Sequence, residues 1–300
     1  MSGQKVDAKA SALMILAGMA TLGFSDNLVA TITENGSLWQ FHFIRGGMAA
    51  LIFCAVGLLG FGRLRPRKWG AVLGRSLIIA SAMLIYFGSL AYMPIGVVVA
   101  GLFTAPMFVL LIAVVFQGRR VGPFRWGAVA IGFAGVVMVI EPDPGNLNWL
   151  SFLPILAGAL YAVGAVATRA WCEGEGTVAL CAVFFAVLSV MGAVGIWLLP
   201  EGLPVGADGF ALRGWMPLTP LMLLSYFIQA IGAVVGIAFL FGGYQRGDAS
   251  FVAIFEYSML VFATSWAWIL WGETVAPLAL MGMALIVLAG AIIALRGGNR

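Results

Sequence analysis

The sequence predicts an all-α integral membrane protein whose ten transmembrane helices form two inverted five-helix repeats, with both termini in the cytoplasm. Three observations predict this: the composition, the spacing of apolar stretches and the placement of Lys and Arg. Of the 300 residues, 62% are apolar and 9% are charged, whereas soluble domains are about 45–50% apolar and about 25% charged. This composition excludes a water-soluble fold, and no nucleic-acid partner is expected.

Ten apolar stretches follow one another along the chain. A spanning helix needs about 20 residues, so ten spans leave room only for short tails and loops. The stretch 125–140 is the shortest and needs its flanking residues to cross. The expected spans are 10–33, 38–60, 69–92, 95–117, 125–140, 150–171, 178–199, 217–241, 249–271 and 275–295.

The basic residues predict the orientation, because short cytoplasmic loops of membrane proteins are enriched in Lys and Arg. With a cytoplasmic amino terminus, only Arg213 falls in an outer loop. The bases expected on the inner side are Lys5, Lys9, Arg63, Arg65, Arg67, Lys68, Arg119, Arg120, Arg125, Arg246, Arg296 and Arg300.

An internal repeat is visible near the ends of the fourth and ninth spans. Phe108, Ala113, Gly118, Val121 and Pro123 return at a constant offset of 154 as Phe262, Ala267, Gly272, Val275 and Pro277. The predicted repeats are residues 1–145 and 146–300. Because each holds five spans, the second copy enters the membrane from the opposite side, as in alternating-access carriers.

Several short motifs, taken in their order and spacing, resemble the ten-helix drug/metabolite transporter superfamily in its EamA-type branch. They are Phe43-Ile44-Arg45, Pro106, the run from Arg125-Trp126 to Val136, Ala167-Thr168-Arg169 and Trp271-Gly272-Glu273. The chain departs from the family pattern at Gln117-Gly118-Arg119, and Leu260 stands where a second-half proline would match Pro106. The resemblance implies a central cavity lined by spans one to four and six to nine, and movement of small metabolites.

Two charged residues, Asp26 in the first span and Arg45 in the second, are expected at the same depth. A hairpin centred between Asn35 and Gly36 places both roughly 10–15 Å below the outer end at 1.5 Å per residue. One interpretation is an ion pair that joins the two helices, and the other is direct contact with a charged group of the substrate. Ionisable groups at membrane depth are costly and usually functional.

Glu256 lies about seven residues into the ninth span, in the sequence Phe255-Glu256-Tyr257-Ser258, with no base in neighbouring turns. Such a carboxylate suits proton coupling or attraction of a cation, and Asp26 is a second candidate for this role. The alternative is a structural ion pair with a base such as Arg75.

Further polar and aromatic side chains at depth are candidates for the substrate-binding site. Together with Asp26, Arg45 and Glu256, the predicted substrate-binding residues are Tyr86, Thr104, Tyr161, Tyr226, Gln229 and Tyr257. Pro106 is a candidate hinge, because proline removes a backbone donor and bends a helix. His42, the single histidine, is expected near the outer surface as an interfacial hydrogen-bonding residue.

These residues predict a secondary-active transporter of a small amphipathic metabolite, most simply a zwitterion or an amine such as an amino acid or a quaternary ammonium compound. The alternative is a multidrug exporter of lipophilic cations; a channel and an intramembrane enzyme are less consistent with the residues. Enzyme activity is not expected, because no nucleophile elbow occurs. Neither a cofactor nor a metal is expected. The expected partners are the lipid bilayer of a bacterial inner membrane and the substrate, with the chain a monomer or homodimer.

Overall fold

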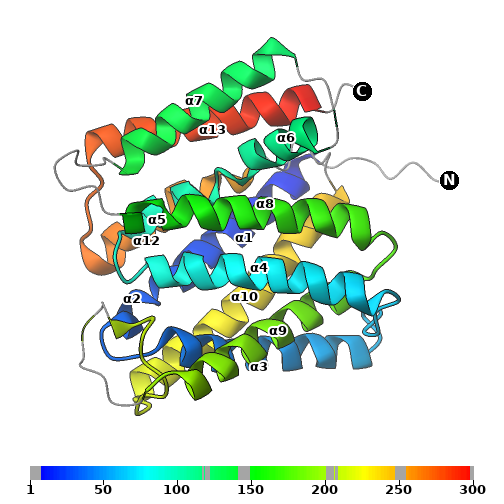
Figure 1. The fold of residues 1–300 in the computed structure, drawn as a ribbon, viewed down its shortest axis with the longest axis vertical. Coiled ribbons are helices and arrows are strands. Elements are labelled where there is room, and N and C mark those ends of the chain that lie inside the picture. The colour runs from blue at the N-terminus through cyan, green and yellow to red at the C-terminus, as the bar shows by residue number, and fades with distance from the viewer. Residues whose placement is uncertain are drawn as a thin grey trace. The chain divides into compact units, whose positions relative to one another are not determined.

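The computed structural model confirms the all-α prediction (Figure 1). It describes residues 8–116, 118, 122–140, 149–200, 206, 209–246 and 255–297, and no β-strand occurs among them. Several residues used in the orientation and repeat predictions lie outside this part of the chain, namely Lys5, Gln117, Arg119, Arg120, Val121 and Arg300.

Each predicted span overlaps a helix or a broken pair of helices, although residues 249–254 at the start of the ninth span lie outside the described part of the chain. Seven helical segments in the described residues are long and apolar enough to cross a membrane, and Trp126–Ile140, Ser258–Trp271 and Pro277–Ile292 are shorter apolar helices. The helices are α1 (Ala8–Asn27), α2 (Ala30–Thr33), α3 (Leu38–Leu58), α4 (Trp69–Ser89), α5 (Ile95–Leu102), α6 (Ala105–Val115), α7 (Pro123–Ile140), α8 (Leu153–Trp171), α9 (Thr177–Leu198), α10 (Pro220–Arg246), α12 (Ser258–Trp271) and α13 (Pro277–Gly297), with a 3-10 turn at Trp149–Phe152.

The fourth and ninth spans are interrupted at positions that the repeat relates. The fourth span breaks at Phe103 and Thr104, between α5 and α6, and Tyr257 forms a turn just before α12. Phe103 and Tyr257 are separated by the repeat offset of 154. Pro106 lies in the first turn of α6, where a helix does not need the backbone donor that proline lacks. The break therefore precedes the proline and leaves α6 regular.

The helices fall into two compact units, which are described separately. Unit 1 comprises Met1–Asn27, Pro94–Ile155 and Val235–Arg300. Within it α1 packs on α12, and α7 lies beside α13 (Figure 1). Gly135 of α7 and Gly282 of α13 meet so closely that a Cβ on either would lie within 2.6 Å of the other's carbonyl oxygen. Small residues of this kind let helix backbones approach in membranes.

Unit 2 comprises Leu28–Met93 and Leu156–Val234. Its helices α3 and α9 pack along their lengths, and α4 packs on α9 (Figure 1). A Cβ on Gly192 of α9 would lie 2.5 Å from the backbone nitrogen of Phe43. Like unit 1, unit 2 takes helices from both halves of the sequence, so the compact units differ from the predicted repeats. The repeat boundaries and the orientation of the termini stay predictions.

The segment 209–219, between α9 and α10, covers the amino-terminal end of α3. Ser37 accepts hydrogen bonds from the backbone of Trp39 and Gln40 and donates one to the Arg213 carbonyl at 2.7 Å. Arg213 donates to the carbonyls of Thr33 and Glu34, each at 2.7 Å. The sequence places Arg213 in an outer loop, but its side chain is fully buried, and this burial lowers the pKa of its guanidinium.

Candidate substrate-binding and coupling sites

The clearest functional feature of unit 2 is a buried arginine enclosed by aromatic rings. The Cζ atom of Arg45 lies 4.6 Å from the ring centre of Phe87, 5.2 Å from that of Phe41 and 5.8 Å from that of Phe185. Arg45 is 5% exposed, and all three rings are buried. We call these four residues the arginine cage.

Three helices contribute to the arginine cage. Phe41 and Arg45 are four residues apart on α3 and therefore share one helix face. Phe87 comes from α4, and Phe185 comes from α9. The close approach of α3 and α9 at Gly46, where a Cβ would lie 3.0 Å from the Phe185 carbonyl oxygen, brings the Phe185 backbone next to the α3 helix.

The energy of the cage explains how an arginine is tolerated at this depth. An arginine at the centre of a spanning helix raises the free energy of membrane insertion by about 2.5–3.5 kcal/mol. A cation–π contact contributes about 0.5–1 kcal/mol at exposed sites and about 2 kcal/mol when desolvated. Three rings can therefore offset the cost without adding much net stability. The faces of the rings hold the guanidinium in position.

Polar atoms beside the cage have no hydrogen-bond partner in the described part of the chain. They are both ring nitrogens of His42 and the hydroxyl of Tyr226. The Tyr226 ring lies 5.7 Å from the Phe41 ring, and the His42 ring lies 5.3 Å from the Phe87 ring. Buried polar atoms are normally hydrogen-bonded, so these atoms have unused hydrogen-bonding capacity beside the cage. His42, which is expected near the outer surface, has a fully buried side chain in unit 2, and its depth in the membrane stays a prediction.

Unit 1 contains the predicted carboxylate, Glu256, and it has a phenolic partner. The Tyr244 hydroxyl, from the last turns of α10, donates a hydrogen bond to Oε1 of Glu256. Arg75, considered as a partner for Glu256, instead donates from Nε to Thr168 Oγ1 at 2.8 Å and from Nη1 to the Leu180 carbonyl at 3.3 Å. Sequence reasoning missed Tyr244, because no local pattern links it to Glu256 across the chain segment that separates them.

Residues at the two helix interruptions meet inside unit 1. The rings of Phe103 and Tyr257 lie 5.1 Å apart, so the breaks of the fourth and ninth spans are neighbours. The Thr104 hydroxyl donates to the Gly101 carbonyl at 2.6 Å and thereby helps to close the end of α5. Gly290 of α13 lies directly against the Tyr257 ring. Glu256 immediately precedes Tyr257 in the chain and therefore lies next to this junction.

The remaining predicted residues occupy different surroundings. Asp26 is buried in α1 of unit 1, whereas Arg45 belongs to unit 2, and their pairing stays a prediction. Tyr86 and Gln229 are buried in unit 2, with the Tyr86 ring 4.9 Å from that of Phe87. Tyr161 is 40% exposed on α8. In the described residues, no group of three His, Cys, Asp or Glu side chains could hold a metal ion.

The long apolar helices, with the few charged groups at membrane depth, define a multi-pass membrane protein. Residues 9–141 match the EamA-like transporter family. The chain is 26% identical to a riboflavin transporter of Rhizobium johnstonii, over 93% of this chain and 89% of the relative. It is 24% identical to the pseudopaline exporter CntI of Pseudomonas aeruginosa, over 92% and 93%.

An S-adenosylmethionine uptake transporter of Rickettsia felis is 23% identical over 70% of this chain and 68% of its own. A protein of known crystal structure superposes with a TM-score of 0.63 at 16% identity, over 98% of this chain and 100% of that chain, which shows a shared fold. These findings confirm the resemblance to the EamA-type transporters of the drug/metabolite transporter superfamily. The chain is a membrane transporter and a multi-pass bacterial membrane protein.

Proposed function

We propose that the chain is a secondary-active carrier that works by alternating access and moves a small metabolite bearing both a carboxylate and a flat ring. The observation that carries this proposal is the arginine cage. A guanidinium presents a planar set of donors that matches a carboxylate, and its aromatic neighbours offer surfaces on which a ring can stack.

A zwitterion fits these groups better than a lipophilic cation. Arg45 supplies a fixed positive charge inside the cage, and like charges brought together at low dielectric repel strongly. The predicted alternative, a multidrug exporter of lipophilic cations, would have to overcome this repulsion. Glu256, held by Tyr244, is proposed to bind the coupling proton or cation.

The substrates of the relatives share parts of this chemistry. The three relatives are a riboflavin transporter, a pseudopaline exporter and an S-adenosylmethionine uptake transporter. Riboflavin has a flat ring system but no carboxylate, whereas S-adenosylmethionine joins an adenine ring to an amino acid. We therefore propose S-adenosylmethionine and the aromatic amino acids as the first compounds to test, with riboflavin as a comparison that has the ring but no carboxylate.

A two-stage experiment tests the proposal. Purified protein is first screened for thermal stabilisation, because a ligand at 100 times its Kd adds about 2.7 kcal/mol to the free energy of unfolding. Each compound that stabilises the protein is then tested in proteoliposomes for counterflow of labelled solute. A carrier shows saturable uptake that requires unlabelled solute inside.

Tetraphenylphosphonium serves as the cationic comparison. The proposed substrate class would be contradicted if tetraphenylphosphonium stabilised the protein and showed counterflow while the ring-bearing zwitterions did neither. Flux that never saturates would instead indicate a channel. Arg45→Gln is the matched variant, and it should abolish counterflow while leaving the protein folded.

A further inference from the structure

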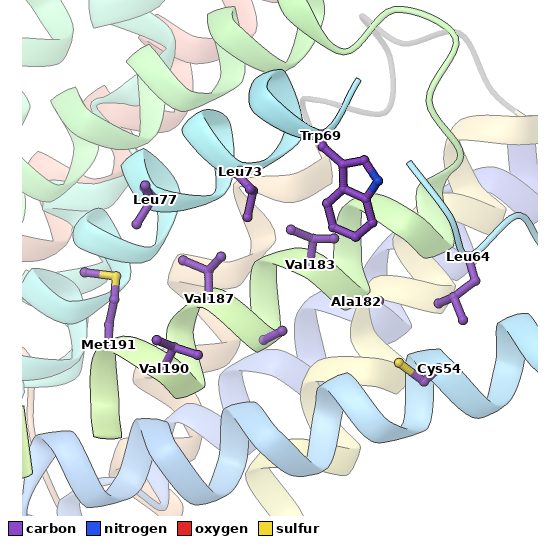
Figure 2. Close-up of a pocket in the computed structure, with 11 residues that line it drawn as sticks. Cys54, Leu64, Trp69, Leu73, Leu77, Ala182, Val183, Val187, Val190 and Met191 are labelled. Carbon is purple, nitrogen blue, oxygen red and sulfur yellow. The ribbon is translucent and has the colours of Figure 1, made fainter. Parts of the chain in front are cut away.

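An apolar groove lies on unit 2 between α4 and α9 (Figure 2). Its volume is about 530 Å³. Figure 2 shows Trp69, Leu73 and Leu77 of α4 along one side and the side chains of α9 along the other. Cys54 of α3 and Leu64 of the loop before α4 lie at the Trp69 end. The groove is almost wholly apolar, and its α4 wall is about half exposed.

The length of the groove matches the depth of one membrane leaflet. Eight residues separate Trp69 from Leu77, which is a rise of about 12 Å along a helix. Half of a hydrocarbon core of about 30 Å is about 15 Å. Tryptophan is enriched at membrane interfaces, so Trp69 is expected at the headgroup level and Leu77 near the middle of the bilayer.

The headgroup end of the groove carries a cluster of positive charge. The loop before α4 holds the exposed bases Arg63, Arg65, Arg67 and Lys68, directly beside Leu64 and Trp69. The Glu175 carboxylate orders this loop, because it accepts hydrogen bonds from the backbone nitrogens of Arg67 and Lys68 at 2.6–3.0 Å. The Glu175 charge also acts on Arg63 and Arg67, and the side chains of all four bases are exposed at the surface.

We infer that this groove binds an anionic phospholipid, with one acyl chain between α4 and α9 and the headgroup phosphate on the basic loop. Each Lys or Arg near the membrane surface strengthens the binding of anionic lipids. The length of the groove matches that of an acyl chain in one leaflet. A second copy of the chain is a poorer occupant. A two-fold interface brings the same surface of both copies together and would place the two basic loops against each other.

Tryptophan quenching by brominated lipids tests this inference on the full chain. The protein is reconstituted in phosphatidylcholine bilayers that contain increasing fractions of acyl-dibrominated phosphatidylglycerol or, separately, dibrominated phosphatidylcholine. The contribution of Trp69 is the difference between the unsubstituted protein and Trp69→Phe. We expect half-maximal quenching of Trp69 at a phosphatidylglycerol fraction at least about fivefold lower than for phosphatidylcholine, which is the effect of a single base near the headgroup.

Matched variants separate the groove from general surface attraction. Arg65→Gln should reduce the preference for phosphatidylglycerol about fivefold, whereas Arg169→Gln, which removes an exposed base outside the groove, should leave it unchanged. Ala186→Phe fills the groove and should weaken quenching, whereas Ala165→Phe, on the exposed face of α8, should not.

Equal quenching by the two lipids would overturn the inference, as would equal effects of Arg65→Gln and Arg169→Gln. Loss of Trp69 quenching together with cross-linking of two copies through Cys54 would place a second copy in the groove instead.

Discussion

Arg45 illustrates how a single residue links stability to function. Its side chain is costly at membrane depth, and the rings of Phe41, Phe87 and Phe185 offset this cost by their positions around the guanidinium. A ligand that brings a carboxylate to Arg45 gains a charge-assisted hydrogen bond in a medium of low dielectric.

Arg45→Gln should therefore weaken substrate binding by about 30-fold or more, since loss of one partner of a buried charged contact costs about 2–5 kcal/mol. Arg45→Lys keeps the charge but loses the planar donors, and its binding should be intermediate. Thermal-shift titration gives the affinity, and the melting temperature without ligand serves as the folding control. Unchanged affinity in Arg45→Gln would remove Arg45 from the site.

Glu256 and Tyr244 allow a second test of single residues. Glu256→Gln removes the charge and should abolish substrate accumulation driven by a proton or cation gradient. Tyr244→Phe removes only the hydrogen bond and should retain transport with an altered pH profile. Uptake into proteoliposomes under imposed gradients measures both effects. Gradient-driven uptake with the same pH profile in Glu256→Gln would contradict the coupling role.

At the scale of elements, the buried side chain of Arg213 joins the segment 209–219 to the end of the first span. Its guanidinium donates hydrogen bonds to the backbone carbonyls of Thr33 and Glu34. Arg213→Met should lower the free energy of unfolding by about 1.5–3 kcal/mol, the usual contribution of a hydrogen bond to a charged group. Denaturant unfolding in detergent measures this loss. Arg169→Met, at an exposed position, is the control, and an equal loss in both would show that Arg213 has no such role.

The start of α4 depends on Glu175 in a manner that changes with pH. Hydrogen bonds from the Arg67 and Lys68 backbones hold the pKa of Glu175 below its ordinary value, with Arg67 contributing most. The carboxylate therefore stabilises the fold above its ordinary pKa, near 4.5, and this contribution is lost as pH falls through the lowered value.

Glu175→Gln should accordingly lower the melting temperature at neutral pH and have little effect in strong acid. Thermal unfolding of both proteins across this pH range measures the difference. Glu173→Gln, at a neighbouring exposed position, is the control. A difference that persists below the lowered pKa would show that the carboxylate charge is not the cause.

At the scale of the whole molecule, the inverted repeat makes a prediction about membrane sides. Arg65 lies between the second and third spans, and Leu212 lies between the corresponding spans of the second half. Inversion places these loops on opposite sides. With the native cysteines replaced, Leu212→Cys should react with an impermeant thiol reagent applied to intact cells, and Arg65→Cys should not.

Reaction of Arg65→Cys and Leu212→Cys on the same side would mean that the copies are parallel. Disruption of the membrane provides the control, because both cysteines should then react.

The sequence by itself determined the all-α class, the spans and the points where they end. These follow from the bilayer thickness and from glycine, proline and charged residues, whose effects are local along the chain. It also singled out Arg45 and Glu256, because a charge within an apolar stretch is visible without a structure.

Only the tertiary structure decided which residues meet these charges. Among 21 phenylalanines, nothing in the sequence distinguishes Phe41, Phe87 and Phe185 as the rings around Arg45, since they come from three helices. The same holds for Tyr244 beside Glu256 and for the burial of Arg213. Such contacts depend on how helices cross, and the crossings depend on side-chain packing between segments that are distant in sequence.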